Sequence, residues 1–329
     1  MTIQWIGPAG GLGNRILGIG SVLALSKIIK TTIAFPWESN SSCPADYHDL
    51  FEDMPGIIVE DSLIKGNGLI GGNRWEPIMI FREFKKEVSP ELSLEEYCFS
   101  FVEAMRSLKF KKSILDEASS YYRKGKNHKN LAIHVRRTDR IKHHKNSLYR
   151  LLSANPHRVK RNLYIIRNTG VRKTLQYALL PKSLIRSLEN RKLAKLCNTL
   201  LCKDESINYS IYADSNYELV NLQQCIYNLG ISERRYLPSY CNVLDKNSWG
   251  EFGKRQTSVE HALIELLCMS MSSGILQNIS TSSFSICSSI IGSTPILTSQ
   301  SRHLFWRVIK QTLGKYPYEI QTTSDTMLS

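Results

Sequence analysis

Apolar and polar positions in the first part of the chain follow the periods of a strand, a helix and a second strand. Residues 2–6 and 31–35 are short apolar runs that predict strands, and a glycine-rich turn separates the first run from the segment 15–30. That segment is apolar at positions 16, 19, 23 and 28, close to helical spacing, although three small residues within it weaken the pattern. The chain is therefore expected to begin with a β-α-β unit.

Strand and helix patterns also alternate through the second half of the chain. Leu131 to Val135 is apolar and β-branched enough for a strand that is buried on both faces. Further strands are predicted in SIYAD, RRYLP, GILQNIS and TPILT, and helices in residues 181–201, in NYELVNLQQCIYNL, in SVEHALIELLCMSMSS and at the end of TSSFSICSSIIG; in the first half, a helix is predicted at 93–110 within the mixed region 56–130. This alternation is typical of an α/β fold with a parallel sheet covered by helices.

Length and composition allow two domains. The chain has 329 residues, of which 42% are apolar, and a polar linker, RKGKNHKN, marks the expected boundary between residues 1–128 and 129–329. No run of about 18 apolar residues occurs, and the first residues lack the pattern of a secretory signal. The eight cysteines form no C-x-x-C pair. These features predict a cytoplasmic protein without a membrane span, with reduced and mostly buried thiols.

The positive charge is concentrated in one segment. Residues 140–195 hold 15 Lys and Arg against one acid, Glu189, and this surplus of 14 equals the net charge of the whole chain. Such a segment attracts phosphates, anionic lipid head groups or nucleic acid, and the charge alone does not say which. We expect peripheral contact with an anionic membrane surface, at its inner face. Liposome binding that depends on neither anionic lipid nor salt would contradict this expectation.

Two arginines follow the predicted strand 131–135 in the stretch IHVRRTDR. Arg136 and Arg137 stand where the strand ends, and ligands of open α/β sheets bind at the carboxyl ends of the strands. A guanidinium can grip phosphate oxygens with two parallel hydrogen bonds. A plain ion pair with Asp139 is the alternative, but the buried strand before the pair favours a phosphate site.

The stretch GGLGN, residues 10–14, resembles a dinucleotide-binding turn only in part. Gly11 and Gly13 fit the G-x-G-x-x-G spacing, but Ile16 occupies the position of the third glycine, and no acid ends the next strand. NAD binding is therefore not favoured. The glycines would still let the backbone approach a ligand or a facing domain, at a point where Asn14 and Arg15 open the helix.

Hydroxyl and acidic side chains are expected at the edge of the second sheet. Ser282 and Ser283 lie near the start of a predicted helix, where they either bind an anion or simply cap the helix. Asp214 ends the SIYAD strand. Glu265 belongs to an otherwise apolar helix, so its carboxylate is either exposed or held there for a purpose.

These stretches, in this order, resemble the GDP-fucose-dependent fucosyltransferases with two Rossmann-like domains. That superfamily joins the α1,2- and α1,6-fucosyltransferases, the nodulation fucosyltransferase and the protein O-fucosyltransferases. GGLGNRILGIGSVLALSK is similar to the opening of the α1,2 group, TTIAFPW to the nodulation enzyme, LAIHVRRTDR to the H-x-R-R-x-D signature, and NISTSSFSICSSIIGS to the third conserved region. The resemblance covers about a third of the chain and implies a GT-B-like fold, with two Rossmann-like domains facing a central cleft.

The resemblance also implies roles for individual residues. Arg136 and Arg137 would hold the GDP diphosphate, with Arg136 as the catalytic group that stabilises charge on the leaving β-phosphate. The other implied donor contacts are Gly11, Gly13, Asn14, His134, Asp214, Glu265, Ser282, Ser283 and Phe284. Residues 1–128 would take the acceptor side and residues 129–329 the nucleotide.

The sequence departs from the family after the arginine signature. The α1,6 enzymes carry a glutamate base there, whereas this chain reads IKHHKNS. His143 or His144 would replace the base, because an imidazole transfers protons near neutral pH. An acceptor that needs no strong base is equally open, since the reaction can pass through an oxocarbenium-like state. Thr138 therefore does not fix an α1,6 linkage.

The sequence thus predicts an inverting, metal-independent glycosyltransferase that moves L-fucose from GDP-fucose to a hydroxyl of a glycan or glycolipid, with no other cofactor. The alternatives are a transferase of another GDP-sugar and, in a different class, a basic nucleic-acid-binding protein.

Overall fold

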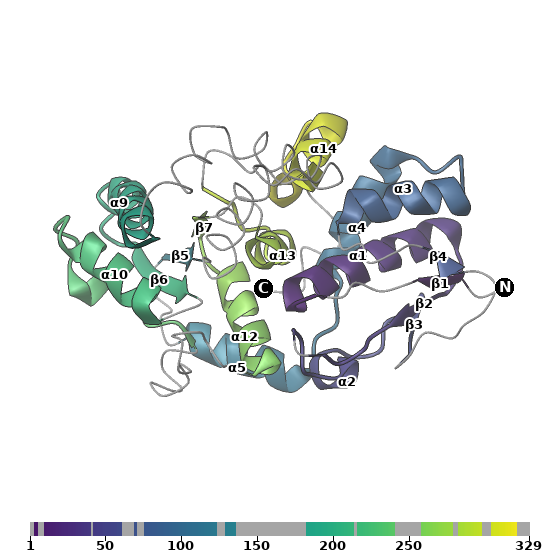
Figure 1. Ribbon diagram of the computed structural model, residues 1–329, viewed down its shortest axis with the longest axis horizontal. Coiled ribbons are helices and arrows are strands. Elements are labelled where there is room, and N and C mark those ends of the chain that lie inside the picture. Colours follow the sequence, from purple (N-terminus) through teal and green to yellow (C-terminus); the bar gives the residue numbers. More distant parts are fainter. Residues whose placement is uncertain are drawn as a thin grey trace, which may run out of the picture.

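The computed structural model describes residues 3–5, 10–40, 42–60, 69–70, 76–123, 129–135, 182–213, 216–240, 258–278, 282–297 and 304–320. Within these ranges helices alternate with strands, and the strands form two parallel sheets, one in each half of the molecule (Figure 1). The α/β class expected from the sequence is confirmed.

The N-terminal sheet has the strand order β3-β2-β1-β4. Its strands, all parallel, are β1 (Ile3–Trp5), β2 (Ile33–Pro36), β3 (Ile57–Glu60) and β4 (Leu69–Ile70). Helix α1 (Leu12–Ile29) connects β1 to β2, so the predicted β-α-β unit is confirmed. The helix begins three residues earlier than expected, because Gly11 takes the extended backbone of an N-cap.

Helix α1 is the central helix of this half. A Cβ atom on Gly20 would lie 2.4 Å from Sδ of Met105 on α4 (Leu94–Arg106), so a small residue here lets α4 cross closely. By length and composition alone α1 could cross a membrane, since its mean hydropathy is 1.4, so the expected absence of a membrane span stays a prediction. The helix is 72% buried inside the protein, however, as a core helix is.

Among the described residues, the N-terminal half also holds α2 (Tyr47–Leu50) and α3 (Pro77–Glu87), and α5 (Lys112–Arg123) contacts α12 (Val259–Ser270) of the C-terminal half. The hydroxyl of Ser93 accepts a hydrogen bond from the backbone N–H of Glu96 and so caps α4. This helix ends at Arg106 rather than at the predicted Phe110. Phe110 instead forms a β-bridge with Phe51, beside α2.

In the C-terminal sheet β5 (Asn130–Val135) lies between β6 (Asn208–Ala213) and β7 (Gly274–Gln277). All three strands are parallel, and His134 of β5 is opposite Tyr212 and Gln277. The strands predicted in RRYLP and TPILT are reduced to single bridges, through Tyr236 on one side of the sheet and Ile296 on the other.

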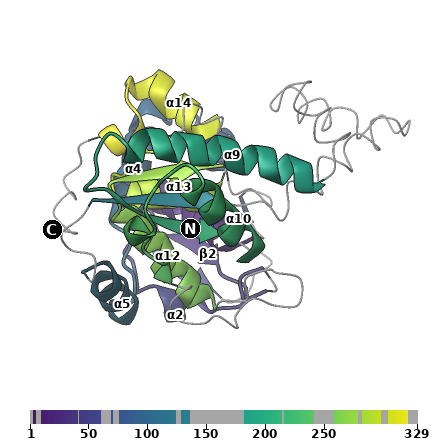
Figure 2. The same ribbon diagram turned by 90° about the vertical axis from the view of Figure 1, so that its left-hand side faces the viewer.

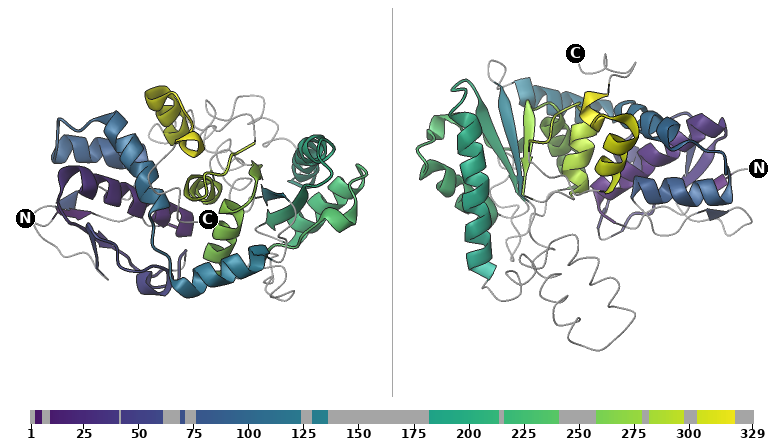
Figure 3. Two further views of the ribbon diagram at one scale, coloured as in Figure 1. Left: turned by 180° about the vertical axis from the view of Figure 1, so that it is seen from behind. Right: turned by 90° about the horizontal axis from the view of Figure 1, so that it is seen from above.

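Helices cover both faces of this sheet. On the outer face, Leu131, Ile133 and Val135 pack with α9 (Lys182–Leu201) and α10 (Asn216–Tyr227), the layer that faces the viewer in Figure 2. On the inner face lie α12 (Val259–Ser270) and α13 (Ser283–Ile291), between the sheet and α1 (Figure 3, right). The inner hydrophobic core continues without a break into the N-terminal half. Strand β5 is buried along its whole length, as predicted.

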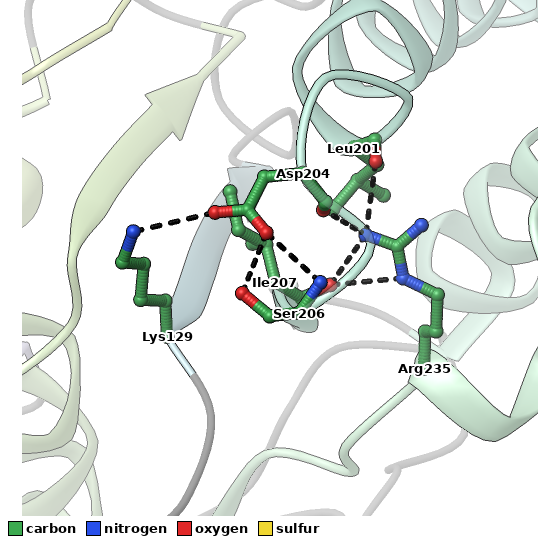
Figure 4. Close-up of polar contacts among 6 residues, drawn as sticks. All are labelled: Lys129, Leu201, Asp204, Ser206, Ile207 and Arg235. Atoms are coloured by element: carbon green, nitrogen blue, oxygen red, sulfur yellow. Dashed lines mark hydrogen bonds and ion pairs between the residues drawn. The ribbon is translucent and has the colours of Figure 1, made fainter.

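The amino-terminal edge of this sheet is held together by polar contacts (Figure 4). Arg235, at the end of the short helix η1 (Glu233–Arg235), donates to the carbonyl oxygens of Leu201, Asp204 and Ile207 at 2.6–3.1 Å. Nζ of Lys129 lies 3.3 Å from a carboxylate oxygen of Asp204, and this pair joins the start of β5 to the turn before β6. The opposite, carboxyl-terminal edge therefore remains for a ligand.

The last described segment lies against the N-terminal half. It comprises α14 (Leu304–Leu313), which contacts α3 and α4, and η2 (Pro317–Glu319). The buried guanidinium of Arg106 on α4 donates to the carbonyls of Ile290, Pro317 and Ile320 at 3.1, 3.2 and 2.6 Å. One arginine thus ties α4, the end of α13 and η2 together. The domain boundary at 128/129 stays a prediction.

Replacing Arg106 with lysine is expected to lower the free energy of unfolding by about 1–3 kcal/mol, because a lysine cannot serve all three buried carbonyls. Urea denaturation measures this loss. Arg82→Lys, at an exposed position of α3, should change the stability by less than about 0.5 kcal/mol. Equal stabilities of the two variants would show that Arg106 does not hold the C-terminal segment.

Candidate functional site

The first turns of α1 and α13 are in close contact, although almost the whole chain separates them. A Cβ atom on Gly13 would lie 2.9 Å from the backbone nitrogen of Phe284 and 2.9 Å from Oγ of Ser283. Sγ of Cys287, one turn further along α13, donates to the carbonyl oxygen of Gly13 at 3.3 Å. The structure therefore brings together two of the stretches that the sequence singles out, GGLGN and STSSF, and only a glycine fits at position 13.

Neither helix is capped by a side chain where the two meet. Gly11 and Ser282 are the N-cap residues of α1 and α13; neither supplies a capping hydrogen bond, and neither helix has an acid in its first turn. By contrast, α4 and α12 are capped by serines and carry glutamates in their first turns. The N–H groups and dipoles at the starts of α1 and α13 thus remain available for an anion.

Strand β5 brings His134 to the same place. Its Nδ1 lies 2.5 Å from Oγ of Ser285, and its ring lies 5.5 Å from the ring of Phe284, both on α13. The His134 side chain is buried, with 8% of its surface exposed. The end of the central strand is therefore fixed against the first turn of α13, as a ligand site at a strand end requires.

A buried arginine organises the turn before α1. Nε of Arg15 donates to the carbonyl of Gly10 at 3.0 Å, and Nη2 donates to the carbonyl of Glu38 at 2.7 Å. The guanidinium also lies 4.8 Å from the ring centre of Trp37. Gly10 has a φ of 150°, and a Cβ there would approach Nδ2 of Asn14 to 3.0 Å. The Asn14 amide thus rests on a turn that Arg15 holds in place.

Three other predicted contacts have clear positions. Gly11 is less crowded than Gly13, since its nearest neighbour would be the carbonyl oxygen of Ser42 at 3.8 Å. The hydroxyl of Ser282 is buried and forms no hydrogen bond within the described residues, so simple capping is not its role. Glu265 is fully buried on α12. The pKa of Tyr212 is raised chiefly by the burial of its own phenol, and further by the neighbouring side chains of Cys268 and Glu265. The exposed alternative for Glu265 is therefore wrong.

The remaining predicted residues, Arg136, Arg137, His143, His144 and Asp214, lie outside the described residues. Strand β5 ends at Val135, directly before Arg136, and strand β6 ends at Ala213, directly before Asp214. Their roles stay predictions.

Sequence reasoning did not identify Ser285, Cys287 or Gln277. Ser285 ends the stretch before the predicted helix and Cys287 belongs to that helix, and neither was given a role, because their contacts with His134 and Gly13 depend on how distant segments pack. Gln277 was read only as part of the strand GILQNIS. A polar residue that ends an apolar strand was the one available signal for it.

A pocket of about 490 Å³ lies at the other end of α1. Its lining includes Lys27, Lys30 and Glu103, and the 2.5 Å ion pair between Lys27 and Glu103 offsets part of the positive charge. Because α1 is roughly 27 Å long, this pocket is remote from Gly13. It does not belong to the site at the two helix starts.

No family profile and no curated protein sequence matches the chain. Among solved structures, the apo form of POFUT1 is similar with a TM-score of 0.50 and 11% identity, over 91% of this chain and 98% of that one. NodZ α1,6-fucosyltransferase soaked with GDP-fucose is similar with a TM-score of 0.49 and 15% identity, over 92% of this chain and 96% of that one. For the fucosyltransferase NodZ from Bradyrhizobium the TM-score is 0.46 and the identity 14%, over 87% of this chain and 91% of that one. The chain therefore has a GDP-fucose fucosyltransferase-like fold, at low sequence identity.

Proposed function

We propose that this protein is an inverting glycosyltransferase that moves L-fucose from GDP-fucose to a hydroxyl of a glycan acceptor without a metal ion. The sequence signatures support the donor and the reaction. The fold shared with POFUT1, which has been solved in complex with GDP-fucose, agrees with them.

One observation carries the proposal: two helix starts without side-chain caps meet at the carboxyl-terminal edge of the second sheet. Gly13 brings α1 against Ser283 and Phe284. Two dipoles that point their positive ends at one place repel each other, and a bound anion relieves that repulsion. A diphosphate fits this requirement, because its oxygens can accept hydrogen bonds from several backbone N–H groups at once.

In this proposal the two halves face each other across a cleft, in a GT-B-like arrangement. The C-terminal half binds the nucleotide through His134, Ser282 and Phe284. Asn14, on the turn held by Arg15, reaches the donor from the acceptor side. The glycine-rich turn then serves to join the two halves at the donor, a role that differs from NAD binding.

Catalysis in this account is mainly electrostatic. As the bond between fucose and the β-phosphate breaks, negative charge grows on the phosphate, and Arg136 and Arg137 stabilise it. The acceptor hydroxyl attacks from the opposite face, so a β-linked donor gives an α-linked product. His143 or His144 removes the hydroxyl proton, unless an oxocarbenium-like state makes a base unnecessary.

A panel of nucleotide sugars, assayed by release of GDP or UDP with mixed glycan acceptors, tests the donor. The proposal predicts turnover with GDP-fucose and at least about tenfold less with GDP-mannose or UDP-sugars. Turnover with GDP-mannose but not with GDP-fucose would leave the alternative of another GDP-sugar transferase.

The basic segment 140–195 supports two further readings. As part of the enzyme, it would bring the protein to an anionic membrane surface where glycolipid acceptors are found. As the main functional element, it would bind nucleic acid, and that binding would be steeply salt-dependent. We favour the first reading, because the glycine turn and the serines at α13 serve no purpose in the second.

A further inference from the structure

Gln277 is the last residue of β7, and it lies beside His134. The two residues are opposite each other in the parallel register, so their side chains project from the same face of the sheet. On that face, His134 contacts Ser285 and Phe284 of α13. Gln277 is therefore directed into the layer where α13 begins.

The amide of Gln277 is buried without any hydrogen bond in the described part of the chain. Only 3% of the residue is exposed, and neither Nε2 nor Oε1 has a partner there. Burying both ends of an amide unpaired is destabilising, and most native proteins avoid it. A second buried group without such a partner, the hydroxyl of Ser282, lies five residues along the chain at the start of α13.

Another buried amide on the same face shows the contrast. Asn130, at the first position of β5, is 7% exposed, and its amide pairs with Oγ of Ser210 at 3.3 and 3.4 Å. This amide lies at the amino-terminal edge of the sheet, away from the helix starts. Within the described residues, the Asn130 amide at the amino-terminal edge of the sheet is therefore hydrogen-bonded, whereas the Gln277 amide at the carboxyl-terminal edge is not.

We propose that Gln277 is a donor-binding residue whose amide hydrogen-bonds to hydroxyl groups of the nucleotide sugar, on the ribose or on the transferred fucose. This inference rests on the proposed function for the identity of the ligand. An amide suits the task, because it donates through Nε2 and accepts through Oε1, and sugar hydroxyls do both. A bound donor would hydrogen-bond to both Nε2 and Oε1, so the unpaired amide would destabilise only the protein without ligand.

Gln277→Met, which keeps the length of the side chain, tests this with two readouts. Calorimetric titration should show GDP-fucose binding about 5- to 10-fold more weakly, the loss of one or two neutral hydrogen bonds. The unfolding midpoint of the free protein should stay the same or rise by about 2–4 °C, because an unpaired buried amide is removed. Asn130→Leu is the matched control and should do the reverse, lowering the midpoint while GDP-fucose affinity is kept.

The nucleotide used in the titration distinguishes the two sources of hydroxyls. If the contact is to the ribose, Gln277→Met weakens binding of GDP and GDP-fucose equally; if it is to the fucose, only GDP-fucose binding is weakened. Unchanged affinity for both ligands overturns the inference, and so does a midpoint that falls together with affinity, since the amide would then be structural. If the native protein binds no GDP-fucose, the proposed function fails, and the midpoint alone decides whether the amide destabilises the free protein.

Discussion

A protein carrying Gly13→Ala is expected to bind GDP at least about tenfold more weakly than the native protein. The added methyl group would lie 2.9 Å from the backbone nitrogen of Phe284 and 3.1 Å from the carbonyl carbon of Ser283. Backbone atoms at the start of a helix cannot rotate away as a side chain can, so the first turn of α13 must shift. Overpacking of this kind costs about 1–3 kcal/mol, and here the cost falls on the N–H groups proposed to hold the diphosphate.

Gly20→Ala is the matched control on the same helix. Its methyl group would lie 2.4 Å from Sδ of Met105, a flexible side chain that can move aside. Alanine gains about the same helix propensity at both positions, so that contribution cancels in the comparison. Calorimetric titration should give native GDP affinity for Gly20→Ala. Equal affinities of the Gly13 and Gly20 variants would contradict the close approach of α1 and α13 at the nucleotide.

Replacing Arg136 with alanine is expected to lower kcat/KM for fucose transfer by roughly 100-fold or more. Loss of a charge-assisted contact of about 1.5–3 kcal/mol already corresponds to about 10- to 100-fold. The deficit should exceed this, because the guanidinium is proposed to act where negative charge grows in the transition state. The melting temperature should remain close to the native value, and Arg137→Ala is expected to behave in the same way.

Arg234→Ala, at an exposed position of η1, serves as the control and should keep native transfer. The nucleic-acid reading makes the opposite forecast, namely that tight and salt-dependent RNA or DNA binding survives Arg136→Ala. Turnover of the Arg136 variant near the native value would reject the role assigned to the arginine signature.

Local sequence pattern was sufficient for the elements that pack by simple periodicity. The strand 131–135 was predicted from a mostly apolar, β-branched run and is buried along its length. RRYLP and TPILT were predicted as strands because of their composition, but each makes only one bridge, at Tyr236 and Ile296. Whether an edge segment pairs along its whole length depends on its neighbours in space, which local pattern does not contain.

The residues of the site were predictable only where they belong to a recognisable sequence motif. Gly13, Ser283 and Phe284 were singled out from two short stretches, and the structure brings them into contact. The partners of His134 and of Arg15 were not predictable, because a hydroxyl on a distant helix and two backbone carbonyls leave no mark in the sequence. Small residues within α1 weakened the prediction of that helix. One of them, Gly20, is there because Met105 of a distant helix packs against it, and local pattern does not contain such a contact.

A crystal structure with GDP bound tests the central claim most directly. The account predicts that the diphosphate lies at the first turn of α13, beside the start of α1, with its oxygens within hydrogen-bonding distance of the free backbone N–H groups of that turn. GDP bound instead in the pocket beside Lys27 and Lys30, at the far end of α1, or anywhere that leaves the first turn of α13 empty, would contradict it.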